Sequence, residues 1–254
     1  LFGKYDLVIS NPPYIKKQDL KYLEKDVTDY EPELALNGGQ DGFSKITAQG
    51  KSIKDAEQLI RTIDLCGVTP LVRLTSNNPD QVKRVLDAGA KGIIVPMIKS
   101  PDDAQSAIDA AYYPPLGRRS FGLARAQGYG TSFNNYLTQS YQDTVVILQI
   151  EHIDALESLE EILSLDNVDG YIIGPYDLSG SMGIPGQFDN EDYLKTIRKI
   201  KSIAGIVNKP GGIHIVEPDY DAYKEATRDY DFIAYSVDFR MLDVSSRIVT
   251  KKTD

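Results

Sequence analysis

The feature that most constrains the fold is a regular alternation of apolar runs and amphipathic segments from Ser52 onward. The apolar runs are short and rich in Val, Ile and Leu, and the segments between them repeat apolar residues at helical spacing. Buried strands that alternate with helices are typical of a parallel sheet covered by helices. The expected strands are 70–74, 93–97, 145–151, 171–174, 212–216 and 232–237, and the expected helices are 52–65, 79–88, 101–111, 155–164, 192–207 and 219–227.

Two architectures fit such a pattern, a (β/α)8 barrel of the TIM-barrel type and a doubly wound open sheet. Polar or charged residues recur at the carboxyl ends of the expected strands, and a barrel would gather those positions into one ring. We therefore expect an α/β chain of the barrel type. Because a closed barrel needs eight strands and six are expected after Ser52, two βα units are expected to be missing or replaced. The residues at the strand ends are Arg73, Glu151, Asp177 and Asp238.

Composition narrows the classes of function. The chain has 254 residues, enough for one large barrel, and its net charge of −9 disfavours nucleic-acid binding, which needs a basic surface. No apolar run approaches the roughly 20 residues of a membrane-spanning helix. The single cysteine, Cys66, cannot form an internal disulfide, so a reducing cytoplasm is the expected location, and the residue itself is expected to be small and buried. No signal-peptide pattern opens the chain.

Two motifs carry the chemistry, LQIE at 148–151 and GPYDLS at 174–179. Each is expected to end a strand with a carboxylate, Glu151 in the first and Asp177 in the second. Two carboxylates at neighbouring strand ends can hold a hard cation such as Mg²⁺ or Mn²⁺, which can polarise a 2-oxo acid. Arg73 would add a fixed positive charge beside a developing enolate. From spacing alone, capping or ion-pair roles for these carboxylates explain the pattern equally well.

The region from about 52 to 243 resembles the HpcH/HpaI aldolase and citrate lyase family, the class II pyruvate aldolases. The resemblance implies a (β/α)8 barrel, assembly into homo-oligomers, and reversible aldol cleavage of a 2-oxo acid to pyruvate and an aldehyde. It also implies a divalent metal, Mg²⁺ or Mn²⁺, with Co²⁺ as a further option. The matching stretches are PLVRL (70–74), KRVLDAGAKGIIVPM (83–97), YPPLGRRSFGLARAQGYG (113–130), LQIE (148–151) and GPYDLSGSMGIPG (174–186).

The same resemblance assigns roles to single residues. Glu151 and Asp177 match the family's metal ligands, and Arg73 matches the arginine that stabilises the pyruvate enolate. Three further matches belong to the substrate site. Gln149 matches a polar residue beside the metal, and the backbone of Tyr176 and Asp177 matches the part that holds the pyruvate carboxylate. Arg125 matches a residue in a loop that contributes to the substrate pocket.

One departure from the family is serious. The resemblance implies that the first two βα units of the barrel precede residue 52, and in this chain they are expected to be missing or replaced. The second strand of the family normally ends in an Asp-x-Glu-His type motif whose histidine is the acid/base, and this chain has no such motif. Its only histidines are His152, expected to point away from the metal, and His214, expected within a strand. The absence predicts impaired turnover. The alternative is therefore an inactive barrel remnant.

Residues 1–50 resemble a different family, the C-terminal half of a release-factor glutamine methyltransferase. The matching stretches are YDLVISNPPYI (5–15) and DYEPELALNGGQDG (29–42). No Gly-rich turn that would hold S-adenosylmethionine is present, so methyl transfer is the lesser alternative and the motif is expected to be vestigial. We divide the chain into 1–50 and 51–254, and expect 5–10 to fill a vacant strand position. The vestigial motif is Asn11, Pro12, Pro13 and Tyr14.

Overall fold

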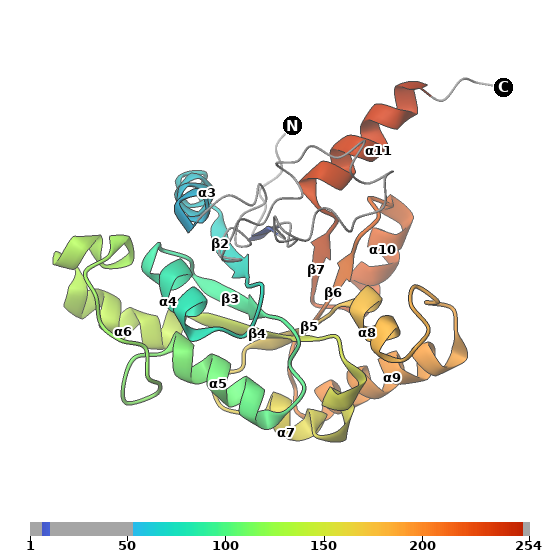
Figure 1. The fold of residues 1–254 in the computed structure, drawn as a ribbon, viewed down its shortest axis with the longest axis horizontal. Helices are drawn as coiled ribbons and strands as arrows, with labels where there is room; N and C mark the ends of the chain where they lie inside the picture. The colour runs from blue at the N-terminus through green and yellow to red at the C-terminus, as the bar shows by residue number, and fades with distance from the viewer. Residues whose placement is uncertain (1–6, 11–52, 251–254) are drawn as a thin grey trace, which may run out of the picture. The chain divides into compact units, whose positions relative to one another are not determined.

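The computed structural model describes residues 7–10 and 53–250 (Figure 1). Contacts divide the chain into two compact units, Leu1–Pro96 with Asp102–Ile147, and Met97–Pro101 with Leu148–Asp254. The long strand β4, Val145–Ile150, begins in the first unit and ends in the second. In both units parallel strands alternate with helices, so the parallel α/β organisation expected from the sequence is confirmed. Closure into an eight-stranded barrel stays a prediction.

In the first unit the strands lie in the order β1-β2-β3-β4. The bounds are Leu7–Ser10 for β1, Thr69–Arg73 for β2 and Gly92–Val95 for β3. β1 pairs in parallel with β2, so the expectation that this segment joins the sheet is confirmed for its last four residues. The helical elements of this unit are α3 (Ile53–Leu65), α4 (Pro79–Asp87), α5 (Pro101–Ala111), η3 (Arg125–Gly130) and α6 (Phe133–Asp143).

Local sequence explains how α4 begins. The Asn78 side chain accepts hydrogen bonds from the N–H groups of Asp80 and Gln81, and Pro79 occupies the first helical position, where no N–H is needed. The helix buries Val82, and β3 beside it is buried along its whole length. Cys66, expected to be buried, is exposed, because it follows the last turn of α3 at the surface.

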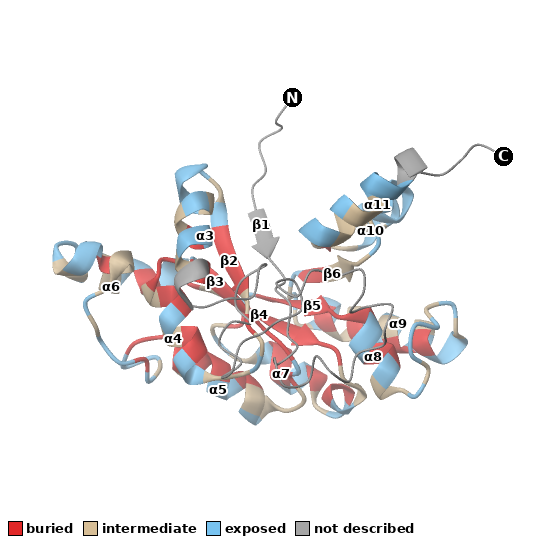
Figure 2. Ribbon diagram, turned by 45° about the horizontal axis from the view of Figure 1, so that its top comes forward, coloured by how far each residue is buried: buried red, intermediate tan, exposed pale blue. Residues whose placement is uncertain are grey.

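In the second unit the strands lie in the order β4-β5-β6-β7. The bounds are Gly170–Ile173 for β5, Gly211–Ile215 for β6 and Phe232–Tyr235 for β7. β5 is buried throughout, whereas β6 and β7 are largely half-buried (Figure 2). None of the helices described in the chain is long and apolar enough to cross a membrane. The helical elements are η4 (Ile153–Glu157), α7 (Leu159–Ser164), α8 (Pro175–Ser181), α9 (Glu191–Ile206), α10 (Tyr220–Asp229) and α11 (Asp238–Thr250).

Candidate functional site

The Glu151 carboxylate is the centre of the candidate site. Glu151 follows β4 directly and is fully buried, with 0% of its surface exposed. Its Oε1 accepts a hydrogen bond from the Met97 backbone N–H at 2.9 Å, and its Oε2 accepts one from the Gln149 side-chain amide at 2.6 Å. All three residues belong to the second unit. A buried carboxylate held by donors at both oxygens has a fixed orientation.

Gly174 leaves the space that this arrangement needs. It follows β5, and a Cβ built there would lie 2.4 Å from Oε2 of Glu151 and 2.8 Å from the amide nitrogen of Gln149. Its φ of −99° is open to any residue, so glycine is required here by space and not by backbone angle. The end of β5 therefore packs closely against two polar side chains of the neighbouring strand.

Asp177 does not end a strand, which corrects the expectation from the sequence. β5 stops at Ile173, and the chain turns at once into α8, with Pro175 at the first helical position. Asp177 and Tyr176 thus lie in the first turn of α8, and both are exposed. A carboxylate is favoured there because the helix N-terminus carries partial positive charge.

The Gly- and Pro-rich stretch after α8 is a turn fastened to that helix. The buried Ser179 hydroxyl donates to the Tyr176 carbonyl and accepts from the Gly186 N–H, both at 3.0 Å. The Tyr176 ring lies edge-to-face against Phe188, with centroids 5.0 Å apart. The end of the turn therefore packs against Tyr176, the residue immediately before Asp177.

The two histidines of the chain lie in separate elements of the second unit. His152 caps η4, where its Nδ1 accepts from the Asp154 N–H at 3.2 Å. His214 lies in β6 opposite Ala234 of β7 and is half-buried. The side chain of His152 therefore caps the start of η4, and its orientation relative to a metal stays a prediction.

The two arginines of the predicted site lie in the first unit. Arg73 is the last residue of β2 and is half-buried, as its strand-end position predicts. Arg125 donates to the Ala88 carbonyl at 3.0 Å and to Asp64 at 2.7 Å. Because Ala88 closes α4 just before β3, Arg125 lies near the amino end of that strand, whereas barrel active sites form at carboxyl ends. The predicted motif 11–14 lies outside the described residues.

The donor set fits a hard divalent cation. Within residues 56–247, no group of three or more His, Cys, Asp or Glu side chains could hold a metal ion. Mg²⁺, however, is commonly held by one or two carboxylates, with water and substrate oxygens as its other ligands. Glu151 is pre-oriented, and Asp177 supplies a second, exposed carboxylate. These two residues suit such a cation better than a closed structural zinc site, which needs four ligands.

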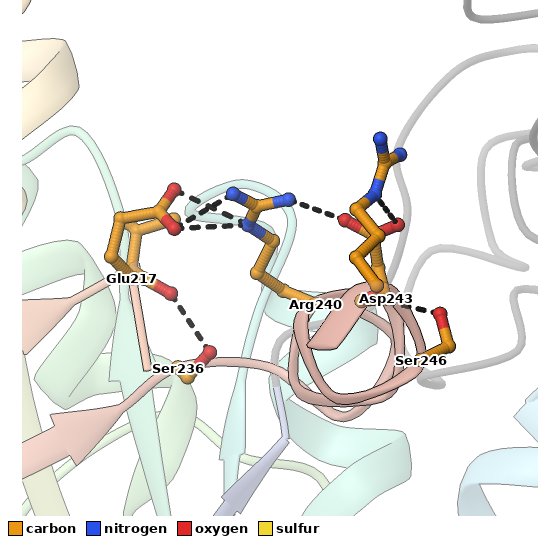
Figure 3. Close-up of polar contacts among 7 residues, drawn as sticks. Glu217, Ser236, Arg240, Asp243 and Ser246 are labelled. Atoms are coloured by element: carbon orange, nitrogen blue, oxygen red, sulfur yellow. Dashed lines mark hydrogen bonds and ion pairs between the residues drawn. The ribbon is translucent and has the colours of Figure 1, made fainter. Parts of the chain in front are cut away.

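An ionic network lies beyond the carboxyl ends of β6 and β7 (Figure 3). Arg240 of α11 contacts Glu217 at 2.8 Å and Asp243 at 2.5 Å, and Arg247 contacts Asp243 at 2.6 Å. The hydrogen bond to Glu217 raises the pKa of Arg240, and the hydrogen bond from Arg247 lowers the pKa of Asp243. This network is absent from the residues predicted from the sequence, although the i, i+3 and i, i+4 spacing within α11 indicates part of it.

The comparisons with known proteins identify a family for this chain. The sequence model described as HpcH/HpaI aldolase/citrate lyase matches residues 21–238. A hydroxypyruvate/pyruvate aldolase of Sagittula stellata is 36% identical over 193 residues, which cover 74% of either chain. A 2-keto-3-deoxy-L-rhamnonate aldolase of Klebsiella pneumoniae subsp. pneumoniae is 31% identical over 215 residues, 82% of this chain and 79% of the relative.

A solved structure shares the fold. The HpcH/HpaI aldolase/citrate lyase family protein from Burkholderia cenocepacia J2315 superposes with a TM-score of 0.74 at 26% identity, covering 80% of this chain and 81% of that one. The family match begins at residue 21 and so includes part of the segment 1–50 that resembles a methyltransferase. None of these matches is to a methyltransferase.

Proposed function

The chain belongs to the HpcH/HpaI aldolase/citrate lyase family, and we propose on this premise that it is a divalent-metal-dependent aldolase of 2-oxo acids. The observation that carries the proposal is the buried Glu151 carboxylate at the end of β4, oriented by Met97 and Gln149. A carboxylate whose oxygens are already oriented suits a hard cation, which takes oxygen ligands. The family membership is the second support for a bound cation.

Glu151 and Asp177 are the residues that would hold this cation. When bound, a divalent cation supplies Lewis-acid polarisation of a 2-oxo acid and so favours its enolate. Glu151 contributes an oxygen whose direction is set before binding, and Asp177 contributes one from the first turn of α8. The backbone N–H groups of Tyr176 and Asp177 open the same helix, where amides have no partner within the helix. We assign them to the carboxylate of the 2-oxo acid.

The other substrate roles rest on the family resemblance. Arg73 would stabilise the enolate oxygen, and Gln149 would both orient Glu151 and contact the substrate. We assign Arg125 no catalytic step, because its guanidinium bridges Ala88 and Asp64. The expected products of cleavage are pyruvate, or a similar 2-oxo acid, and an aldehyde. We expect a homo-oligomer in the cytoplasm, and size-exclusion chromatography with light scattering tests the oligomeric state.

The test uses pyruvate alone and needs no knowledge of the aldehyde. When Mg²⁺ or Mn²⁺ is present, we expect the methyl protons of pyruvate to exchange for deuterons of D₂O. When EDTA removes the metal, we expect this exchange to stop. The Glu151→Gln variant keeps the shape of the side chain but loses its charge, so we expect exchange to fall at least about a hundredfold, as for the loss of a main electrostatic contributor. The measurement is proton NMR of the pyruvate methyl group.

Glu157→Gln is the matched control, because Glu157 is exposed at the end of η4 in the same unit. It should exchange like the unaltered protein. If Glu151→Gln exchanges the pyruvate protons as fast as the unaltered protein does, the assignment of Glu151 to the metal site is wrong. If the unaltered protein is folded and binds metal but exchanges no protons, the result favours the alternative of an inactive barrel remnant. The reason would be that the chain lacks the acid/base histidine motif.

A further inference from the structure

The backbone of Met97 adopts a conformation that its side chain does not favour. Its φ is +56°, in the left-handed region, where residues with a Cβ are uncommon. Asn tolerates this region because its short polar side chain can hydrogen-bond locally, but Met has no such group. A contact elsewhere must therefore hold Met97 in place. In the described part of the chain, the non-glycine residues with positive φ are Met97, Tyr129, Asn167, Asn208 and Ser236.

The contact that this conformation makes is with the candidate metal ligand. Met97 follows β3, and its N–H donates to Oε1 of Glu151 at 2.9 Å, a bond between residues 54 positions apart. Because Glu151 is fully buried, this hydrogen bond to a carboxylate acts in a medium of low dielectric constant, where it is strong. The bond lies wholly within the second unit.

The Met97 side chain is partly exposed, at 42%, and the polar contact of this residue is made by its backbone N–H. We propose that Met97 is a positioning residue that orients Glu151 for cation binding through its left-handed backbone N–H. The Gln149 amide holds the other oxygen, and Gly174 leaves room for both. The cation-binding part of this inference rests on the proposed function, whereas the orientation of Glu151 can be tested without it.

The test compares three substitutions at one position. Glycine favours positive φ and keeps the N–H, so Met97→Gly should bind Mn²⁺ within about twofold of the unaltered protein. Met97→Ala also keeps the N–H and should stay close to it. Valine is β-branched and opposes positive φ, so Met97→Val should lower Mn²⁺ affinity about 10- to 100-fold, as the loss of a partner that orients a ligand does. Electron paramagnetic resonance of free Mn²⁺, without substrate, measures the affinity.

Asn208→Val is the matched control. Asn208 has a φ of +52°, follows α9 in the same unit and is exposed, so valine creates the same backbone conflict away from Glu151. It should lower the melting temperature but leave Mn²⁺ affinity unchanged. If Met97→Val binds Mn²⁺ as tightly as the unaltered protein, or if Met97→Gly and Met97→Ala weaken binding as much as Met97→Val, the inference is overturned.

A second readout does not depend on the metal. The Met97 amide should be protected from hydrogen exchange in the unaltered protein and in Met97→Gly, and should lose protection in Glu151→Leu, which removes the acceptor oxygen. If the unaltered protein binds no Mn²⁺, the proposed function fails while amide protection still decides the positioning role. An unprotected Met97 amide in the folded protein would overturn that role whatever the metal does.

Discussion

At the scale of single residues, the geometry of Glu151 depends on neighbours that carry no charge. Met97 contributes a backbone N–H, Gln149 an amide, and Gly174 only the absence of a side chain. The motifs LQIE and GPYDLS predicted the carboxylates because side-chain chemistry is visible in the sequence. They could not reveal Met97, whose contribution is a backbone angle. Nor could they show that Gly174 is needed for space.

Substituting Gly174 tests this packing. In Gly174→Ala the new Cβ would lie 2.4 Å from Oε2 of Glu151, too close unless the carboxylate moves. We expect the free energy of unfolding to fall by about 1–3 kcal/mol, as in other overpacked sites, and Mn²⁺ affinity to fall with it. Urea denaturation and Mn²⁺ titration measure the two effects.

Gly180→Ala provides the comparison, because a Cβ at this position in α8 meets no atom within 4 Å. The substitution should raise stability by up to about 1 kcal/mol through helix propensity and leave metal binding unchanged. If both variants behave alike, close packing at Gly174 has no role in orienting Glu151.

At the scale of the elements, the sequence predicted best where local chemistry marks an end. The N-cap Asn78 and the following Pro79 defined the start of α4, and α5 begins and ends at the predicted residues 101 and 111. α8 was missed because Gly174 and Pro175 indicate a turn, and the helix they open has only 7 residues. The predicted helix 155–164 is instead a 3₁₀ helix followed by a short α-helix, with Ser158 between them.

The turn after α8 gives a prediction at the same scale. The Ser179 hydroxyl is buried and joins the Tyr176 carbonyl to the Gly186 N–H, so Ser179→Ala leaves both groups without this partner. We expect stability to fall by about 1–3 kcal/mol. The Gly186 amide should exchange faster with D₂O, which hydrogen-exchange mass spectrometry measures.

Ser202→Ala serves as its control, because Ser202 lies on the exposed face of α9. The change should be close to neutral there. Unchanged protection of Gly186 in Ser179→Ala would mean that the turn is held by the contact between Tyr176 and Phe188 instead.

At the scale of the whole molecule, parallel strand pairing follows from what the sequence shows most clearly. Helical segments lie between nearly all successive apolar runs, and chain reversal through a helix makes neighbouring strands parallel. β1 illustrates the limit of this inference. It pairs with β2 because strand pairing requires only an apolar segment of suitable length. The sequence could therefore predict that this segment joins the sheet, whereas its resemblance to a methyltransferase stays a prediction.

We expect stability at alkaline pH to depend on tyrosines of the second unit whose pKa burial raises, among them Tyr171, Tyr193 and Tyr230. Tyr171 of β5 and Tyr193 of α9 are almost fully buried, and burial raises the pKa of each from 10.0 to about 12, with Asp231 adding to the effect on Tyr171. A pKa that is higher in the folded state means that folding favours the neutral phenol. This stability is complete below pH 10 and is lost as pH rises from about 10 to about 12.

We therefore expect the free energy of unfolding, measured in urea across this range, to decrease steeply with pH. Phenylalanine cannot ionise and keeps the shape of the ring, so Tyr171→Phe and Tyr193→Phe should each flatten the curve, and the double variant should flatten it further. Absorbance of the phenolate, followed in the same samples, should show that ionisation of these tyrosines accompanies unfolding. If the double variant lost stability over the same range as the unaltered protein, groups other than these phenols would govern alkaline unfolding.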